Sequence, residues 1–298
     1  MHIMSAAVKV ISNFDYKKLF LFGLSTEVML NDMELQLYRI ENYLRSILIP
    51  VLPYKTTFNF LLFVTKGHIR QHLGVSEFQL EPGSMLLIRQ GSITATLEIS
   101  PDAEGFFLAC ENTVFDHVLL NTPPTFFTLT SPFVSLRKEY YPWMMQLFET
   151  LEQRLQAVEN RNIEIPCLAF QNILTTLVHL DNQHTKTALV SRKSRITQQF
   201  KELIQTHHQV HKEVQFYADE LSISENYLCK CIKETTGKAP KQWLNETTVQ
   251  YSQVLLQNIG KDISSIAYEL NFQSVSHFTR LFKKITGIPP SAYRKKIF

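Results

Sequence analysis

Cysteine is scarce in this chain, whose 298 residues contain four of them. Two, Cys229 and Cys231, lie two positions apart on a predicted helix, so they cannot face each other and form a disulfide. Cys110 and Cys167 are then expected to be buried thiols. The sequence therefore does not predict a disulfide-stabilised secreted domain, and we expect a reducing compartment.

Long apolar runs are also missing. The longest, around Ile47–Leu52 and Phe58–Val64, fall far short of the roughly 20 residues that a membrane-spanning helix needs. We recognise no secretion signal in the sequence. These features predict a soluble, cytoplasmic protein that has no membrane partner.

Glycine is unevenly distributed. Six of the nine glycines precede residue 106, and none occurs between Gly105 and Gly237. We therefore expect a turn-rich first region followed by a mostly helical one. Short β-type runs bounded by turn residues occur in the first region at Thr57–Val64, His68–Leu73, Phe78–Leu80, Met85–Arg89, Ile93–Ile99 and Gly105–Cys110. Their spacing predicts a small antiparallel barrel or sandwich.

Two helices are predicted after these strands. The first follows Pro142, which suits the first turn of a helix, and the second follows Pro166. Their predicted apolar stripes are Trp143, Leu147, Leu151 and Leu155 in the first, and Leu168, Ile173, Leu174 and Leu177 in the second. The two helices are expected to form an antiparallel hairpin, and the polar stretch Asp181–Val190 is the predicted linker.

A duplication near the C-terminus is the most informative feature. Tyr217–Trp243 and Ala267–Tyr293 are weakly similar copies about 50 residues apart, and the offset drops to 49 at the start, so the second copy has one extra residue in its turn. Each copy predicts a short helix, a tight turn, a second helix and a Gly stop. The predicted helices are Val214–Leu221 and Ser224–Thr235 in the first copy, and Ile263–Leu270 and Ser274–Ile285 in the second.

Each copy has the residues that a helix-turn-helix requires. In the first, Ala218 is small enough for close helix packing, Ser224 is a good N-cap, and Gly237 supplies the positive φ that ends the second helix. Their counterparts are Ala267, Ser274 and Gly287. The predicted small cores are Leu221, Leu228 and Ile232, and Leu270, Phe278 and Phe282.

The segment between the copies, Trp243–Asn258, predicts one continuous helix that holds the two copies together. Recognition helices on one face of DNA lie about 34 Å apart, so one chain would read two successive major-groove segments. From Val190 onward there are 16 Lys and Arg against 9 Asp and Glu, a balance of +7, whereas the first 189 residues have 14 against 18, a balance of −4. A basic C-terminal third indicates a polyanionic partner, the alternative being an ordinary solvated surface.

These residues resemble the AraC/XylS family of transcription regulators, in particular the subgroup abundant in Bacteroidetes. The resemblance covers roughly Ser194–Lys296, and the family's usual signature is met at Ile266-Ala267, Phe272, Ser276 with Phe278, Arg280 with Phe282-Lys283, Gly287 with Pro290, and Tyr293-Arg294. Two positions depart from the pattern. Asn271 replaces the usual Gly, and Asn best tolerates a left-handed turn. Thr248 replaces a common Arg, which affects one stabilising contact but not the fold.

The resemblance implies an α+β multidomain protein. Glu81–Ser84 followed by Met85–Ile88 looks like the turn and strand of the cupin-like sensor domains in such regulators. The implied organisation is a cupin-like antiparallel β-barrel at 1–130, a helical hairpin that makes a dimer contact at 131–182, a linker at 183–193, and an all-α double helix-turn-helix at 194–298. The alternative for the hairpin is that both of its faces pack on the barrel.

The exposed faces of the two second helices carry the candidate DNA contacts. Arg280 is the strongest base-reading candidate because Arg can bond guanine O6 and N7 together, the alternative being a phosphate contact or a surface ion pair. By analogy with the family, the base-reading set is Asn226, Cys229, Lys230, Ser276, His277 and Arg280. The phosphate-contacting set is Ser224, Lys233, Ser274, Thr279, Lys283 and Lys284.

No catalytic, metal or cofactor site is predicted. The three histidines within His207–His211 lack a Cys or carboxylate to complete a metal site and are expected at a solvated helix end. Thr236–Lys238 lacks the strand that precedes a phosphate loop and predicts a helix C-cap. His68 and His72 are isolated imidazoles, too few for the metal of a cupin enzyme.

The sequence therefore predicts a sequence-specific DNA-binding transcription regulator and not an enzyme. The resemblance implies double-stranded DNA and RNA polymerase as partners, a homodimer, activation as the usual output, and a small-molecule effector in the barrel. Repression stays open, and so does an N-terminal domain that only dimerises. A metal-dependent cupin enzyme fused to a DNA anchor is the rival from another class. The effector-binding residues and the operator cannot be predicted.

Overall fold

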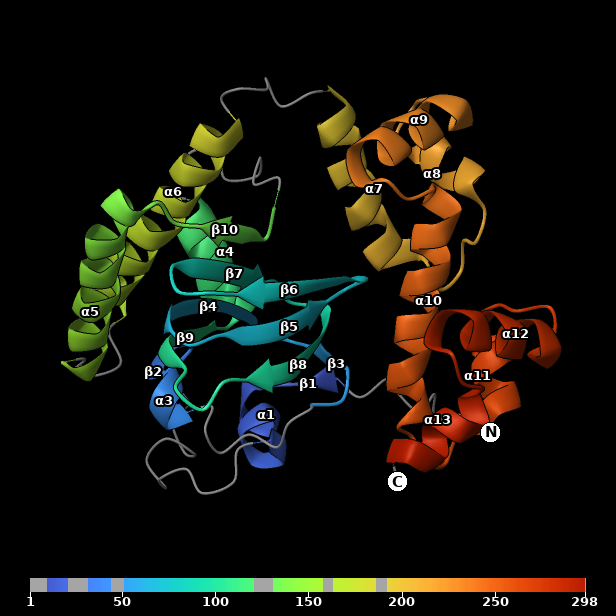
Figure 1. The fold of residues 1–298 in the computed structure, drawn as a ribbon, viewed down its shortest axis with the longest axis horizontal. Coiled ribbons are helices and arrows are strands. Elements are labelled where there is room, and N and C mark those ends of the chain that lie inside the picture. The colour runs from blue at the N-terminus through green and yellow to red at the C-terminus, as the bar shows by residue number, and fades with distance from the viewer. Residues whose placement is uncertain are drawn as a thin grey trace. The chain divides into compact units, whose positions relative to one another are not determined.

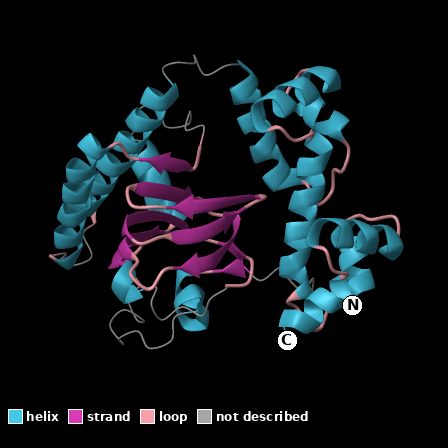
Figure 2. Cartoon of the chain, viewed as in Figure 1, coloured by secondary structure: helices cyan, strands magenta, loops and turns pink. Residues whose placement is uncertain are grey.

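The computed structural model describes residues 10–20, 32–43, 51–120, 131–157, 163–185 and 192–297. The chain divides into two compact units, one built on Ile11–Leu52 with Thr56–Leu189 and the other on Val190–Phe298 together with Val10 and Pro53–Lys55. The first contains sheets and helices, whereas the described part of Val190–Phe298 is entirely helical outside its loops (Figures 1 and 2).

The strands of the described residues lie in two five-stranded sheets, with the orders β1-β3-β8-β5-β6 and β10-β7-β4-β9-β2. Strand β4 pairs antiparallel with β7 and β9, and β5 pairs antiparallel with β6 and β8. The strands are β1 Val10–Ile11, β2 Leu35–Arg39, β3 Tyr54–Thr56, β4 Asn59–Lys66, β5 Ile69–Leu73, β6 Ser76–Leu80, β7 Ser84–Ile88, β8 Ile93–Ile99, β9 Glu104–Cys110 and β10 Phe133–Ser135.

The predicted fold class is confirmed: antiparallel sheets with helices precede a helical double helix-turn-helix. All six predicted runs are strands, β4 to β9. The predicted turn before β7 is present, since Ser84 N donates to Glu81 O at 2.8 Å and Gly83 has a φ of 90°. The strands form two sheets rather than one closed cylinder. Strands β1, β2, β3 and β10 were not predicted.

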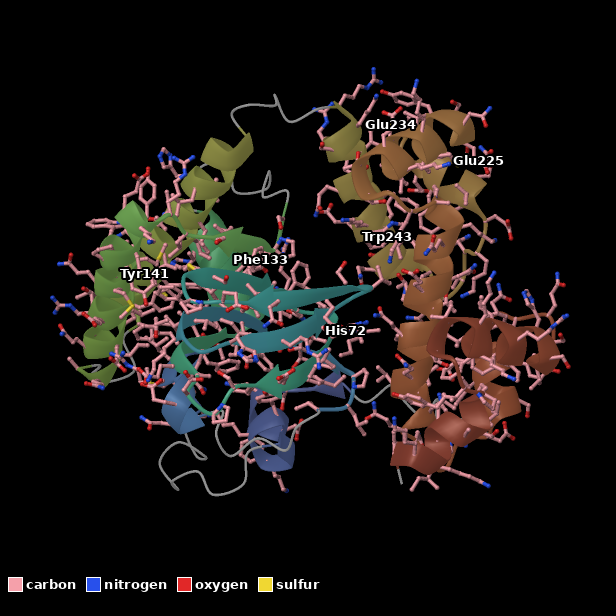
Figure 3. All side chains as sticks on the ribbon, in the orientation of Figure 1. His72, Phe133, Tyr141, Glu225, Glu234 and Trp243 are labelled. Carbon is pink, nitrogen blue, oxygen red and sulfur yellow. The ribbon has the colours of Figure 1, made fainter. Side chains whose placement is uncertain are left out.

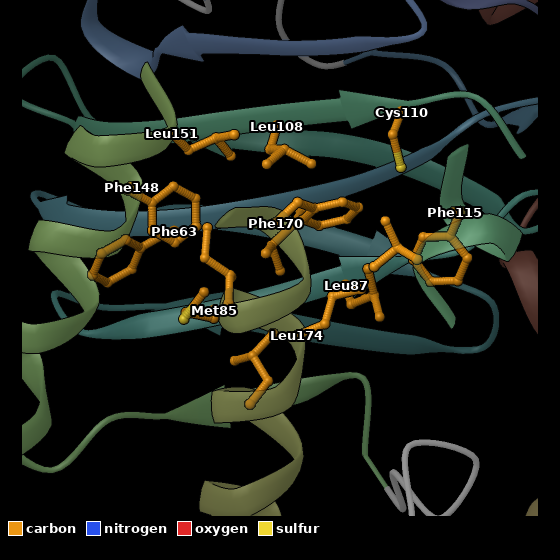
Figure 4. Close-up of a cluster of buried hydrophobic side chains, with 14 of the residues drawn as sticks. Phe63, Met85, Leu87, Leu108, Cys110, Phe115, Phe148, Leu151, Phe170 and Leu174 are labelled. Carbon is orange, nitrogen blue, oxygen red and sulfur yellow. The ribbon is translucent and has the colours of Figure 1, made fainter. Parts of the chain in front are cut away.

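The helices of this unit are α1 Asn13–Phe20, α3 Ile40–Tyr43, α4 Asn112–Leu120, the 3-10 helix η3 Lys138–Tyr140, α5 Tyr141–Gln156 and α6 Glu164–Thr185. Helices α4, α5 and α6 cover one face of the sheet that contains β4, whereas Tyr16 of α1 packs against Phe107. The side chains of β4 alternate: Leu61 and Phe63 join a buried cluster with α4, α5 and α6 (Figure 4), whereas Phe60 points away from that cluster and lies 5.3 Å from Phe107, centroid to centroid. Full burial of each such side chain stabilises the unit by about 1.5–3 kcal/mol.

The apolar stripes of α5 and α6 differ from the prediction. The buried side chains of α5 are Met144, Phe148 and Leu151, while Trp143 is 54% exposed. In α6, Leu168 is 60% exposed, and Ile173, Leu174 and Leu177 are buried as predicted. A strict spacing of four residues drifts around a helix of 3.6 residues per turn, so Trp143 falls beside the buried stripe.

Helix α6 extends to Thr185 and α7 begins at Arg192, so both ends of the stretch 183–193, which was predicted as a linker, are helical. The stretch 181–190 contains no Gly or Pro that would stop a helix. Residues 186–191 lie outside the described residues. The predicted domain boundaries stay predictions.

The second unit contains seven helices among its described residues: α7 Arg192–His207, α8 Val214–Glu220, α9 Glu225–Thr236, α10 Pro240–Leu256, α11 Ile263–Glu269, α12 Val275–Thr286 and α13 Pro290–Ile297. The duplicated motif is therefore α8 with α9 and α11 with α12, and α10 is the predicted connecting helix. Arg294 in α13 donates from Nε to Leu256 O at 3.2 Å, which ties α13 to the end of α10.

The four cysteines of the sequence are free thiols, as predicted. Cys110 and Cys167 are buried, and burial raises the pKa of both. Cys231 is buried in α9, whereas Cys229 is partly exposed on another face of the same helix. The two sulfur atoms therefore belong to different surroundings.

Candidate nucleic-acid interface

The two tight turns have the same backbone hydrogen bonds at an offset of 49 residues. Ile223 N donates to Ala218 O at 3.0 Å, and Phe272 N donates to Ala267 O at 3.0 Å. The extra residue of the second copy follows this point, because α8 and α11 are 49 apart whereas α9 and α12 are 50 apart. The duplication is therefore present in the structure as well as in the sequence.

Asn271 has a φ of 56°, so the left-handed conformation predicted at this position is confirmed. Its counterpart at an offset of 49 is Ser222, which has a φ of 52° and which the sequence analysis missed. A non-glycine residue with positive φ is uncommon, and here both instances mark the same place in the two turns. The offset that aligned the turns is the signal that would have identified Ser222.

The ends of the recognition helices, as we call α9 and α12, are capped as predicted. Ser224 Oγ accepts from Tyr227 N at 3.3 Å, and Ser274 Oγ accepts from His277 N at 3.2 Å. At the other ends, Gly237 and Gly287 have φ values of 73° and 81°. Each cap therefore satisfies backbone groups that a helix end leaves unpaired.

Each recognition helix buries one face and exposes the other. In the first copy Ala218, Leu228 and Ile232 are fully buried, and in the second their counterparts Ala267, Phe278 and Phe282 are fully buried too. Leu270 is buried as predicted, whereas Leu221 is only half-buried, and Cys231 is an additional core residue. These cores fix which face each helix turns outward.

The structure brings the predicted DNA contacts together on two outward faces. The spacing of Asn226, Cys229, Lys230 and Lys233 places them along one side of α9, and the same spacing recurs in α12 at Ser276, Thr279, Arg280 and Lys283. Cys229 and Thr279 are half-buried, and the exposed members of both predicted sets are Ser224, Asn226, Lys230, Lys233, Ser274, Ser276, His277, Arg280, Lys283 and Lys284.

Charge differs between the two faces. Glu234, near the C-terminal end of α9 (Figure 3), forms an ion pair with Lys193 at 2.5 Å, and the hydrogen bond from Lys193 holds the pKa of this carboxyl below its usual range. Its counterpart in α12 is Lys284. The second recognition helix therefore carries two adjacent lysines where the first carries a lysine and a carboxylate.

Tyr227 was missed by the sequence analysis. It is the counterpart of His277 at an offset of 50, and the Arg192 guanidinium lies 5.8 Å from the centre of its ring. The His277 ring instead meets Phe272 edge-on, with centroids 5.5 Å apart. The two recognition helices therefore begin with different aromatic groups, and the alignment of the copies would have revealed the pair.

The prediction of a solvated helix end was wrong for His208. This side chain is 2% exposed, its Nδ1 lies 2.8 Å from Ile204 O, and its ring meets Tyr251 edge-on with centroids 5.2 Å apart. Burial lowers the pKa of His208 to about 4. His207 and His211 are half-buried, and the His211 ring stacks on Phe216 at 3.7 Å.

Other candidate sites have ordinary explanations. Thr236–Lys238 is the end of α9, as predicted, with Gly237 in the left-handed region. His68, just before β5, has its Nε2 3.4 Å from Glu98 Oε1. Burial lowers the pKa of His72 (Figure 3), which lies on β5. The described part of the chain holds no group of three or more His, Cys, Asp or Glu side chains arranged to bind a metal ion.

Comparison with known families identifies the double motif. Residues 217–296 match the family described as helix-turn-helix domain. Over 78 residues the chain is 35% identical to the HTH-type transcriptional activator RhaR of Escherichia coli (strain K12), which covers 26% of this chain and 28% of that protein. It is 25% identical over 153 residues, 51% of each chain, to the uncharacterized HTH-type transcriptional regulator YisR of Bacillus subtilis (strain 168).

This C-terminal segment is therefore a helix-turn-helix domain of the AraC type, which confirms the resemblance seen in the sequence. The chain spans about half, or less, of the length of the curated relatives that it matches. Among solved structures, ToxT from Vibrio cholerae aligns with 88% of this chain and 97% of its own, at 13% identity and a TM-score of 0.44. Across the described ranges, no helix combines the length and the apolar character that crossing a bilayer requires.

Proposed function

We propose that this protein is a sequence-specific DNA-binding transcription regulator whose two recognition helices read two successive major-groove segments. The observation that carries the proposal is the duplicated, capped helix-turn-helix, in which both copies turn polar and basic side chains outward from a closed core. A helix of this kind fits the major groove, and a single chain with two of them contacts sites about one turn of DNA apart.

Base reading is assigned to Asn226, Cys229, Lys230, Ser276, His277 and Arg280. Lys230 and Arg280 occupy equivalent exposed positions of α9 and α12, and a guanidinium or ammonium group there can donate to guanine O6 and N7. Because their neighbours differ between the copies, the two segments of DNA are expected to differ in sequence. The partly exposed thiol of Cys229 offers an apolar contact more than a hydrogen bond.

Phosphate contacts are assigned to Ser224, Lys233, Ser274, Thr279, Lys283 and Lys284. The two serine oxygens accept backbone N–H groups at the helix starts, which leaves each hydroxyl proton available for a phosphate oxygen. A helix N-terminus also favours negative charge. Since Glu234 and Lys193 neutralise each other beside α9, the larger electrostatic share is assigned to α12.

For the N-terminal unit we propose a regulatory role and a part in homodimerisation, without catalysis. Support for the dimer comes from Trp143, Ile165 and Leu168, three large apolar side chains of α5 and α6 that are 54–60% exposed. The resemblance alone supports the regulatory role, the effector, RNA polymerase as a partner and activation. RhaR is named an activator, and repression stays open for this chain. The cytoplasmic location stays a prediction.

Selection of bound fragments from a random DNA pool tests the proposed function. We expect two preferred blocks of sequence whose centres lie about 10 base pairs apart, one turn of the duplex. A single block, or enrichment without any sequence preference, contradicts the proposal.

A further inference from the structure

The segment His208–Lys212, which joins α7 to α8, contacts both the connecting helix and the second helix-turn-helix. Lys212 Nζ donates to Thr248 Oγ1 of α10 at 3.1 Å. Asn271 Nδ2, in the second turn, donates to Val210 O at 3.0 Å. Thr248 and Asn271 are the two positions at which the sequence departs from its family's usual pattern, and both contact this one segment.

The Lys212 ammonium group is held in place from several sides. It donates to His208 O at 2.6 Å and lies 5.4 Å from the centre of the Phe272 ring, in addition to its bond with Thr248. Burial lowers its pKa to about 8, so the group is largely charged at neutral pH. A partly desolvated cation over an aromatic face is attracted more strongly than an exposed one.

Phe272 carries this contact to the second recognition helix. Its ring meets His277 at 5.5 Å and Phe278 at 5.3 Å between centroids. His277 lies in the first turn of α12 and belongs to the base-reading set. A chain of contacts therefore runs from Lys212 in the first half of the unit to the start of the recognition helix in the second half.

We propose that Lys212 and Asn271 are positioning residues that fix the two recognition helices relative to each other and so set which separation of the two DNA segments the protein accepts. The inference rests on the proposed function. Helix α10 already links the two halves, but it ends at Leu256, and residues 257–262 follow before α11. The contact of Lys212 with the Phe272 ring and the hydrogen bond of Asn271 with Val210 O join the two halves directly and do not depend on this short connection.

The geometric part is tested on the full-length protein without DNA. Nitroxide labels are attached through unnatural amino acids at positions 233 and 283, equivalent exposed sites on α9 and α12, and the distance between them is measured by pulsed electron resonance. The variants are Lys212→Met, Asn271→Gly and their combination. Gly keeps the left-handed backbone available and deletes the amide. Ser222→Gly makes the same change at the equivalent turn of the first copy, where the side chain is exposed.

We expect a narrow distance distribution in the wild type and in Ser222→Gly, and a broader or shifted one in the double variant. Circular dichroism confirms that the double variant is folded. An unchanged distribution in the folded double variant overturns the inference.

The functional part uses the unlabelled proteins and the selected DNA site, with one base pair added or removed between its two blocks. The wild type and Ser222→Gly are expected to lose about tenfold or more in affinity, and the double variant less than about threefold. A double variant that broadens the label distances but keeps the full spacing preference overturns the assigned role. Failure of the wild type to bind any specific DNA instead contradicts the proposed function, and the label distances still decide whether the two residues position the helices.

Discussion

Acid should destabilise the C-terminal unit through His208. The side chain is 2% exposed, and its Nδ1 contact with Ile204 O identifies the neutral tautomer that donates from Nδ1. Burial lowers its pKa to about 4, and Lys212 adds to this effect. In the unfolded chain the pKa returns to its ordinary value near 6.5. Between these two values the unfolded state binds a proton that the native state does not.

The sign and size of the effect follow from this difference. The free energy of unfolding is unaffected well above the unfolded pKa, falls as pH drops through about 6.5, and levels off below about 4. Between about pH 7.5 and about pH 5, the loss that this one residue causes is about 2 kcal/mol. Replacement by Phe keeps an aromatic ring against Tyr251 and removes the titrating group.

The assay is urea unfolding followed by tryptophan fluorescence. The chain has two tryptophans, so Trp143→Phe in the exposed position leaves Trp243 as a reporter of the C-terminal unit. In this background, the free energy of unfolding of His208→Phe should fall by about 2 kcal/mol less than that of its parent over that pH range, because the other histidines titrate alike in both proteins. Equal pH dependence in the two proteins would refute the reasoning.

Three further changes test other parts of the structure. Lys284→Ala should weaken binding to specific and random DNA alike and reduce the slope of log affinity against log salt by about 1, whereas loss on specific DNA alone would remove its phosphate assignment. Gly287→Ala adds a Cβ that meets no other atom, but it does so at a φ of 81°. Backbone strain alone should therefore lower the free energy of unfolding in urea by about 1–2 kcal/mol. Glu152→Gln should lower the thermal stability of the N-terminal unit by about 1–2 kcal/mol, because it breaks a two-bond ion pair with partly buried Arg39, and an unchanged melting temperature would contradict this.

The helix-turn-helix copies were predictable because their determinants are local. Caps such as Ser274, the C-terminal Gly287 and the tolerance of Asn271 for positive φ act within a few residues, so the sequence contains them directly. The periodic core residues of the recognition helices were equally clear. Ser222 shows the limit of this approach, because its left-handed backbone comes from the geometry of the turn and not from a special preference of serine.

Features that depend on packing between distant segments were not predictable. Trp143 belongs to an apolar pattern but lies beside the buried stripe, because the sheet that α5 covers selects Met144 and Phe148 instead. His208 looked like part of a polar helix end, but it is buried, with Tyr251 of the distant helix α10 against its ring. The pairing of short strands such as β2 with β9 also depends on partners far along the chain.

DNA selection repeated with Lys230→Ala and Arg280→Ala tests most directly whether the two recognition helices read two different DNA segments. The two side chains occupy equivalent exposed positions on α9 and α12. We predict that each variant loses sequence preference in one block only, that the two affected blocks differ, and that their centres lie about 10 base pairs apart. Loss of preference at the same bases in both variants, or in neither, would contradict the account.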